Sequence, residues 1–213
     1  MNTGHENDTT TEGSTSDSRR KFLQKTTAGV VISSLPATSV WAQSGGGGIL
    51  NSIVASTHAS GWTDGQMALL SQGYWGSKHG IDRSKAVTFE TAFHIGAEPL
   101  LDSGKAEWRT DGNLWAKHGG TWENTDIEKA SLTLYDVVSN TNYMDNVSVQ
   151  IAAMYLNAKH HGEDNLNFPV YDTYTLRPFG SLDLYADWLY ANINTAGFGS
   201  ALELLISENH APK

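Results

Sequence analysis

The chain of 213 residues carries a formal net charge of −9 and contains no cysteine. The acidic balance argues against nucleic acids and anionic membranes as partners, because both attract basic surfaces. The lack of cysteine excludes disulfides, cysteine-ligated iron–sulfur clusters and covalently attached c-type haem, so the fold depends on packing for its stability.

Residues 1–42 have the successive features of an export signal. The segment around Arg19 and Arg20 resembles the twin-arginine consensus, and a moderately apolar stretch over 28–40 and an A-x-A-like cleavage site at 40–42 follow. The apolar stretch is too short to span a bilayer, which requires about 20 apolar residues. We therefore predict a cleaved twin-arginine signal peptide, a periplasmic or extracellular location, the translocase as a transient partner, and no membrane span in the mature chain.

The mature chain is predicted to begin with a flexible arm over 43–48, because four consecutive glycines there have no side chains to pack. We assign 49–213 to one helical domain, with a first helical spacing at 49–54. Two capped helices are expected next. One follows Thr63 and Asp64 with Met67, Leu70 and Tyr74 on one face, and the other follows Ser84 with Val87, Phe89 and Phe93.

Between 96 and 124 the chain is rich in Gly, Asp, Trp and Lys without a sustained period. We predict a long irregular loop in this segment, fastened by the rings of Trp108, Trp115 and Trp122. Loops of this length are usually functional or mobile. The loop is therefore a candidate binding region.

Regular helical spacing returns after 124, and a connector with two prolines later interrupts it. The expected helices carry Ile127, Ala130, Leu134, Val137 and Val138; then Val147, Ile151, Met154, Tyr155 and Ala158, ending at 159–162; and finally 182–193 and 198–205. The predicted fold class is mainly α. We expect a single compact domain of about six short amphipathic helices with one long irregular Trp- and Gly-rich loop.

The stretch QGYWGSKHG, at 72–80, resembles the G-Y/F-W-K-N-H signature of a widespread group of secreted bacterial domains. In that group an F-x-x-x-F segment, an alanine-rich helix, an N-[FY]-P turn and two closing helices follow. The matching stretches here are 89–93, 151–158, 167–169 and 182–208. The sequence departs from the pattern at His79, which stands four residues after Trp75, and at Val149-Gln150, which replace an Arg-His pair. The resemblance implies an exported module associated with a surface or matrix, and no particular chemistry.

Tyr74, Trp75 and His79 in this signature allow two interpretations. A histidine beside two aromatic rings is a candidate ligand site. The same residues could instead anchor a helix to the core, which is the more common use of large aromatic side chains. The choice depends on whether other functional side chains converge on His79.

Seven histidines outside the signal peptide raise the question of a metal site. No pair has the i, i+4 spacing of a helical zinc site, and we predict no metal and no other cofactor. A site assembled from distant positions is the alternative. Its candidate ligands are His79, His160, His161 and Asp164.

The sequence contains no G-x-S-x-G elbow and no nucleophilic cysteine, so it lacks the signatures of serine and cysteine hydrolases. A carboxylate pair for glycoside cleavage depends on spatial rather than sequence spacing. The candidates are Glu90, Glu98, Glu107 and Asp111, whose other explanation is a solvated acidic face.

The expected function is that of an exported non-catalytic module, which associates with itself or binds an envelope protein or polysaccharide. The candidate binding residues are Tyr74, Trp75, His79, Trp108, Trp115 and Trp122. The three tryptophans of the expected loop could stack on sugars or on another subunit, or close the loop over the core. Two alternatives are a small accessory subunit of a twin-arginine-exported oxidoreductase and a metal-dependent hydrolase with a His/Asp site. Bound metal in the purified protein would distinguish these classes.

Overall fold

A computed structural model describes residues 67–170 and 179–211 of the chain. The predictions for the signal peptide with Arg19 and Arg20, for the glycine arm and for a helix at 49–54 fall outside these residues. The same holds for the capping residues Thr63 and Asp64 and for the middle of the proline-containing connector.

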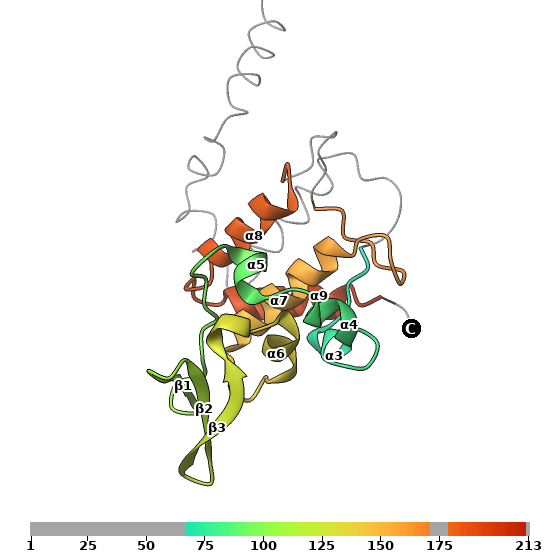
Figure 1. The fold of residues 1–213 in the computed structure, drawn as a ribbon. Coiled ribbons are helices and arrows are strands. Elements are labelled where there is room, and N and C mark those ends of the chain that lie inside the picture. Colours follow the sequence, from blue (N-terminus) through green and yellow to red (C-terminus); the bar gives the residue numbers. More distant parts are fainter. Residues whose placement is uncertain (1–66, 171–178, 212–213) are drawn as a thin grey trace, which may run out of the picture. The chain divides into compact units, whose positions relative to one another are not determined.

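The described residues form a mixed α/β fold, so the expectation of a mainly α fold with about six helices is wrong. Seven α-helices and one three-stranded antiparallel sheet are present in this part of the chain (Figure 1). The helices are α3 (Gln72–Trp75), α4 (Ile81–Lys85), α5 (Phe89–Phe93), α6 (Leu134–Ser139), α7 (Asn146–Lys159), α8 (Leu182–Ala191) and α9 (Phe198–Glu208). The strands are β1 (Ala106–Trp108), β2 (Asn113–His118) and β3 (Thr121–Glu128), and a 3-10 turn, η1 (Lys129–Ser131), follows β3.

The sheet occupies the segment that was expected to be an irregular loop. Its strands run in the order β1-β2-β3, and β2 and β3 are joined by a two-residue turn. Gly119 and Gly120 form this turn with φ of 57° and 96°. A two-residue hairpin turn of type I′ requires positive φ at both positions, which glycine adopts without steric cost. The glycines that suggested a loop therefore specify a hairpin.

The helix expected to include Ile127 begins only at Leu134, about two turns later than predicted. Ile127 lies in β3, where the neighbouring Thr125 hydroxyl donates a hydrogen bond to the Leu114 carbonyl at 2.8 Å. Helix α6 starts after Thr133, whose side chain forms a capping box with Asp136. Pairing between strands therefore overrides the helical spacing before this cap.

The helix expected from Met67 onward is reduced to the four residues of α3. Ala68 exchanges backbone hydrogen bonds with Asn167, with N–O distances of 3.0 and 2.9 Å. The Asn157 side chain accepts a hydrogen bond from the Leu70 N–H at 2.8 Å and donates one to the Leu70 carbonyl at 2.9 Å. These long-range partners hold the segment extended, which a local pattern cannot indicate.

Ser84 does not cap a helix as predicted, because it lies inside α4. Thr88 caps α5 instead, its hydroxyl accepting a hydrogen bond from the Thr91 N–H at 3.1 Å. Thr88 also forms an isolated bridge with Thr133, with backbone hydrogen bonds of 2.8 and 2.9 Å on either side. This bridge ties the start of α5 to the start of α6, the two helices between which the sheet is inserted.

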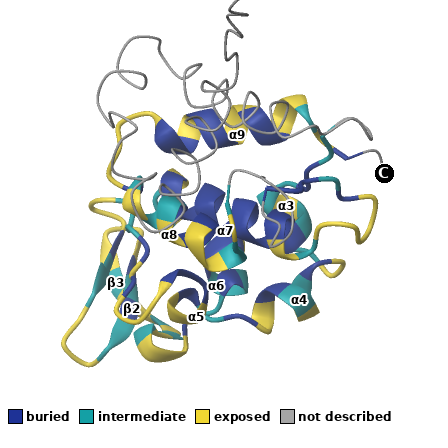
Figure 2. Ribbon diagram, turned by 90° about the horizontal axis from the view of Figure 1, so that it is seen from above, coloured by how far each residue is buried: buried dark blue, intermediate teal, exposed yellow. Residues whose placement is uncertain are grey.

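Helix α7 forms the centre of the core (Figure 2). All twelve residues from Val147 to Ala158 are buried, so the helix is enclosed on every side instead of presenting the single apolar face that its spacing predicted. Helices α3, α6, α8 and α9 pack against it. The two closing helices, α8 and α9, are present where the sequence predicted them. Within the described residues, no helix has the length and apolar character needed to cross a membrane.

Candidate functional site

The signature residues Tyr74, Trp75 and His79 have structural roles in the fold. Trp75 is fully buried, and its ring lies 5.6 Å from the ring of His160 at the end of α7. His79 is exposed and stacks on Tyr74 with ring centroids 6.1 Å apart. The Tyr74 hydroxyl donates a hydrogen bond to Asp164 at 2.7 Å. The signature therefore fastens α3 to the segment after α7.

Two neighbours hold the Trp75 backbone in place. The buried Ser84 hydroxyl lies 2.9 Å from the Trp75 carbonyl and 3.0 Å from the Gly80 carbonyl, which share its single proton. Gly80 approaches so closely that a Cβ atom on it would lie 2.7 Å from the Trp75 Cα. The third glycine of the signature is thus required for the close approach of two backbone segments.

An ion-pair network joins α4 to the loop after α7. Asp164 accepts hydrogen bonds from Tyr74 and from Nη1 of Arg83, and Nε of Arg83 lies 3.3 Å from Oε2 of Glu163. The pKa of Asp164 lies below its ordinary value. The hydrogen bond from the Tyr74 hydroxyl is the main cause, and the bond from Arg83 comes second. Burial, followed by the Asp164 carboxylate, raises the pKa of Tyr74. The network favours an ionised Asp164 and a neutral Tyr74.

The substitution Asp164→Asn is expected to lower the Tm at neutral pH and to have a smaller effect in acid. The pKa of Asp164 is lower in the folded protein than in the unfolded chain. Its contribution to stability is therefore fully present above pH about 3.9, the ordinary aspartate pKa, and is lost as the pH falls through the folded pKa. Asn tolerates the left-handed backbone of this position, where φ is 47°. Thermal unfolding at pH 7 and pH 2 measures the difference.

The control for this experiment is Asp82→Asn, which changes an exposed aspartate of α4 that has no ion pair among the described residues. We expect it to leave the Tm at pH 7 unchanged. An equal loss of Tm at pH 7 and pH 2 in the Asp164→Asn variant would contradict an electrostatic role for Asp164.

The four candidate metal ligands do not form a metal site. His160 Nδ1 lies 3.2 Å from Glu163 and its ring packs on Trp75, while His161 Nδ1 accepts a hydrogen bond from the Phe168 N–H at 3.2 Å. Burial lowers the pKa of His160. Across 67–170 and 179–211, no three histidine, aspartate or glutamate side chains are arranged to hold a metal ion. The hypothesis of a His/Asp metal site therefore gains no support from these residues.

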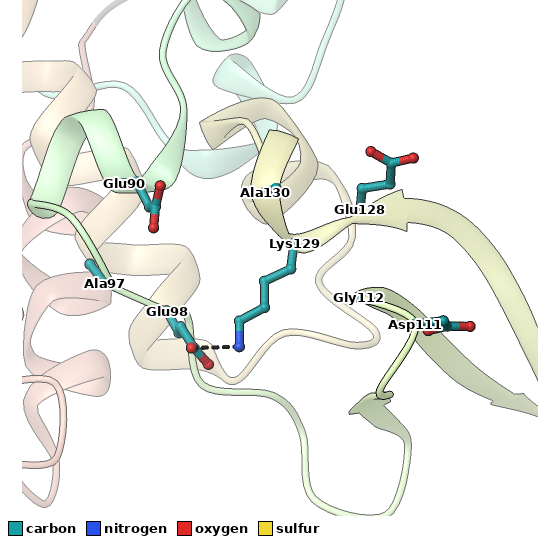
Figure 3. Close-up of a pocket in the computed structure, with 8 residues that line it drawn as sticks. All are labelled: Glu90, Ala97, Glu98, Asp111, Gly112, Glu128, Lys129 and Ala130. Atoms are coloured by element: carbon teal, nitrogen blue, oxygen red, sulfur yellow. Dashed lines mark ion pairs between the residues drawn. The ribbon is translucent and has the colours of Figure 1, made fainter.

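Three of the four candidate carboxylates line one open cleft between the sheet and the helices, with a cavity volume of about 360 Å³ (Figure 3). Its walls are formed by Glu90, Ala97, Glu98, Asp111, Gly112, Glu128, Lys129 and Ala130. Glu98 Oε1 pairs with Lys129 Nζ at 2.5 Å across the cleft, and Glu90 accepts a hydrogen bond from the Gly96 N–H at 3.0 Å. Asp111 points away from this pair in Figure 3.

Asp111 lacks the character of a catalytic acid. It accepts hydrogen bonds from the Asn113 N–H at 2.9 Å and from Trp115 Nε1 at 3.2 Å. These bonds lower the pKa of Asp111, and the bond from the Asn113 N–H has the largest effect. The general acid of a glycosidase requires the opposite shift. Glu107, the fourth candidate, lies on the other side of the sheet and pairs with Arg109. Each of the four carboxylates therefore has a partner in the structure, and the hypothesis of a hydrolytic pair gains no support from it.

The outer face of the sheet brings together Trp115 and Trp122, two of the candidate binding residues. We define this face by Glu107, Arg109, Trp115, Lys117, Trp122 and Asn124. The pairs Glu107–Trp115, Trp115–Asn124 and Lys117–Trp122 stand directly opposite each other across the strands, so they share one face. Leu114 and Ala116 alternate with these residues and are fully buried on the inner face.

Two cations accompany the tryptophan rings on the outer face. The Arg109 guanidinium lies 4.0 Å from the Trp115 ring centroid and 5.8 Å from that of Trp122. Lys117 Nζ lies 6.0 Å from the centroid of Trp122. Arg109 Nε also donates a hydrogen bond to Glu107 at 2.7 Å. The outer face therefore presents two partly exposed indole rings with the planar Arg109 guanidinium stacked on one of them.

Trp108, the third tryptophan of the expected loop, has a different role. It stands opposite Leu114 on the inner face, and Lys129 Nζ lies 5.9 Å from its ring. Trp108 thus lies on the inner face of the sheet, where Lys129 of η1 approaches its ring. Trp115 and Trp122 do not share this role.

The sequence interpretation missed Arg109 and Lys117 as candidate binding residues. In the structure, buried and partly buried positions alternate from 113 to 116, as in a half-buried strand, but the sequence N-L-W-A-K-H has three consecutive apolar residues and gives only a weak alternating signal. Reading this segment as a strand places Lys117 and Trp115 on the same side.

No protein-family model, curated protein or solved structure matches this chain. Any inference about the function of the candidate site is therefore drawn from its geometry and chemistry.

Proposed function

We propose that this protein is an exported non-catalytic module that binds an envelope or extracellular polysaccharide through the outer face of the sheet. The observation that carries the proposal is the pair of partly exposed rings, Trp115 and Trp122, on the solvent side of neighbouring strands. The twin-arginine-like segment and the resemblance to secreted domains support export. The resemblance by itself suggests association with a surface or matrix.

The chemistry of the outer face suits sugar rings. A pyranose has an apolar face of C–H groups and a rim of hydroxyls, so it packs on an aromatic ring while its rim exchanges hydrogen bonds with polar side chains. The outer face supplies the indole of Trp122 together with the polar groups of Glu107, Lys117 and Asn124. The pairing of the three strands places these groups on one face of the sheet.

Self-association by strand addition is disfavoured at β3, which is an edge of the sheet. The side chains of Glu123, Asp126 and Glu128 are exposed along this strand. Acidic residues on an edge strand repel a second copy of the same edge, and a bulge at Asp126, with φ of 60°, interrupts the ladder. The face of the sheet, and not its edge, is therefore the better binding surface.

The substitution Trp122→Ala is expected to weaken polysaccharide binding about tenfold or more, equivalent to about 1.4 kcal/mol, because it removes the exposed stacking surface. Affinity electrophoresis in gels containing xylan, dextran or polygalacturonate measures retention of the protein. Tyr135→Ala is the matched control. Tyr135 is a partly exposed aromatic residue of α6, outside the sheet, with Lys85 Nζ 4.7 Å from its ring.

Retention of the Tyr135→Ala variant should equal that of the wild type. The proposal fails if the wild type binds neither these polymers nor any member of an array of envelope polysaccharides. It also fails if Trp122→Ala is retained as strongly as the wild type.

A further inference from the structure

We propose that the ligand of the outer face is a polysaccharide of uronic acid units, with one carboxylate bound between Arg109 and Lys117. This inference rests on the proposed function and adds the chemical class of the sugar. Three observations support it, concerning the fixed plane of Arg109, the unpaired charge of Lys117 and the balance of charge on the face.

Arg109 is held in one orientation with part of its hydrogen-bonding capacity unused. Stacking on Trp115 at 4.0 Å fixes the guanidinium plane, and the 2.7 Å bond from Nε to Glu107 fixes its rotation in that plane. Among the described residues, no carboxylate pairs with its two terminal nitrogens. A planar guanidinium presents paired N–H groups at the spacing of the two oxygens of a carboxylate. Arg109 is thus preorganised for a carboxylate in the plane of its free edge.

Lys117 provides a second cation beside the same ring. It is exposed, stands directly opposite Trp122 across β2 and β3, and forms no ion pair within the part of the chain that the structure describes. Its ammonium group and the Arg109 guanidinium both lie about 6 Å from the centroid of Trp122. A sugar ring stacked on Trp122 would therefore carry its substituents toward two cations at once.

The outer face brings two cations together although the whole chain has a net charge of −9. Arg109 pairs with Glu107, and Lys117 has no ion-pair partner in the described part of the chain. Asp111 at the margin of the face stays ionised, and its two oxygens accept hydrogen bonds from the Trp115 and Asn113 N–H groups. A uronate carboxylate can pair with both Lys117 and the free edge of Arg109, whereas a neutral polysaccharide leaves both cations to water.

The experiment compares polygalacturonate with carboxyl-reduced polygalacturonate, which keeps the sugar backbone and loses the charges, and with dextran sulfate. Isothermal titration and affinity electrophoresis are made on the wild type, Lys117→Gln, Arg109→Gln, Trp122→Ala and the control Lys85→Gln. Lys85 is the cation near Tyr135, so the control removes a similar cation–aromatic contact away from the sheet. Circular dichroism verifies that each variant is folded.

We expect the wild type to bind polygalacturonate at least tenfold more tightly than the reduced polymer, and Lys117→Gln and Arg109→Gln each to remove most of that preference. Binding of the reduced polymer should change less in these two variants than binding of polygalacturonate, and Lys85→Gln should behave as the wild type throughout.

Each other outcome has a defined meaning. Equal binding of the two polygalacturonates, with loss of both in Trp122→Ala, overturns the inference and leaves the proposed function intact. Tighter binding of dextran sulfate than of polygalacturonate also overturns the inference, because it shows that the face binds polyanions through their charge without preference for a carboxylate. A dimer in size-exclusion chromatography that Trp122→Ala dissociates shows that a second copy covers the face, and it overturns both proposals.

Discussion

The substitution Asn157→Ala should lower the free energy of unfolding by about 3 kcal/mol. Asn157 is fully buried on α7, and its amide accepts from the Leu70 N–H and donates to the Leu70 carbonyl, as a neighbouring β-strand would. Alanine leaves both backbone groups buried without a partner, and each unsatisfied group costs about 1–3 kcal/mol. Urea denaturation followed by tryptophan fluorescence measures the loss.

The same change at the start of the helix provides a matched control. Asn146 is exposed at the first residue of α7, where its Nδ2 donates to Glu203 at the surface and its Oδ1 accepts from Gln150 Nε2 at 3.1 Å. Asn146→Ala should cost less than the Asn157 substitution, about 1 kcal/mol, because water reaches this exposed position and replaces the lost partners. If the two alanine variants unfold at similar urea concentrations, Leu70 is not held to α7 as described.

The substitution Gly80→Ala should destabilise the protein by about 2 kcal/mol or more, although it adds a single methyl group. The new Cβ would lie 2.7 Å from the Trp75 Cα and 2.8 Å from the Tyr74 carbonyl oxygen, and neither backbone atom can rotate away. Relief requires moving α4 away from the buried Trp75. Thermal unfolding should show a Tm lower by about 4–8 °C.

Gly73→Ala, in the same signature, should have the opposite sign. A Cβ at Gly73 would meet nothing closer than the Ser71 hydroxyl at 3.7 Å, and the residue lies inside α3. Alanine is favoured over glycine in a helix by about 0.5–1 kcal/mol, so a small gain in Tm is expected. A stable Gly80→Ala protein would show that the signature is not tightly packed.

The parts of the fold that could be predicted are those whose stability is local. Helices α8 and α9 have apolar residues at helical spacing, and α9 is preceded by Gly197 in the left-handed conformation. The central helix α7 was also recognisable from its apolar and alanine-rich sequence. Its complete burial was not, because it depends on the helices that surround it.

The sheet was missed because its strands are short and irregular. β1 has only three residues, and a register shift between Asn113 and Trp115 interrupts the alternation along β3. The Gly119-Gly120 pair was the clearest hairpin signal, but it stands among other glycines that also suggest a loop. The helix expected at Ile127 was wrong for the same reason, since its apolar residues belong partly to a strand.

The candidate site could be predicted only in part. The signature histidine, His79, raised the question of a site, and the structure places no metal-binding group around it in the described part of the chain. The sequence drew attention to Trp115 and Trp122 but not to Arg109 and Lys117. Which side chains share a face follows from strand register, and register is set by contacts between residues distant in the chain.

The bridge between Thr88 and Thr133 makes the folding of the helical core less dependent on the hairpin. Because α5 and α6 are tied directly to each other, the sheet leaves and re-enters the core at points whose positions do not depend on its sequence. The entropic cost of closing such an excursion rises slowly with its length. Changes on the outer face of the hairpin can therefore accumulate at little cost to folding, as long as Leu114 and Ala116 stay buried on its inner face.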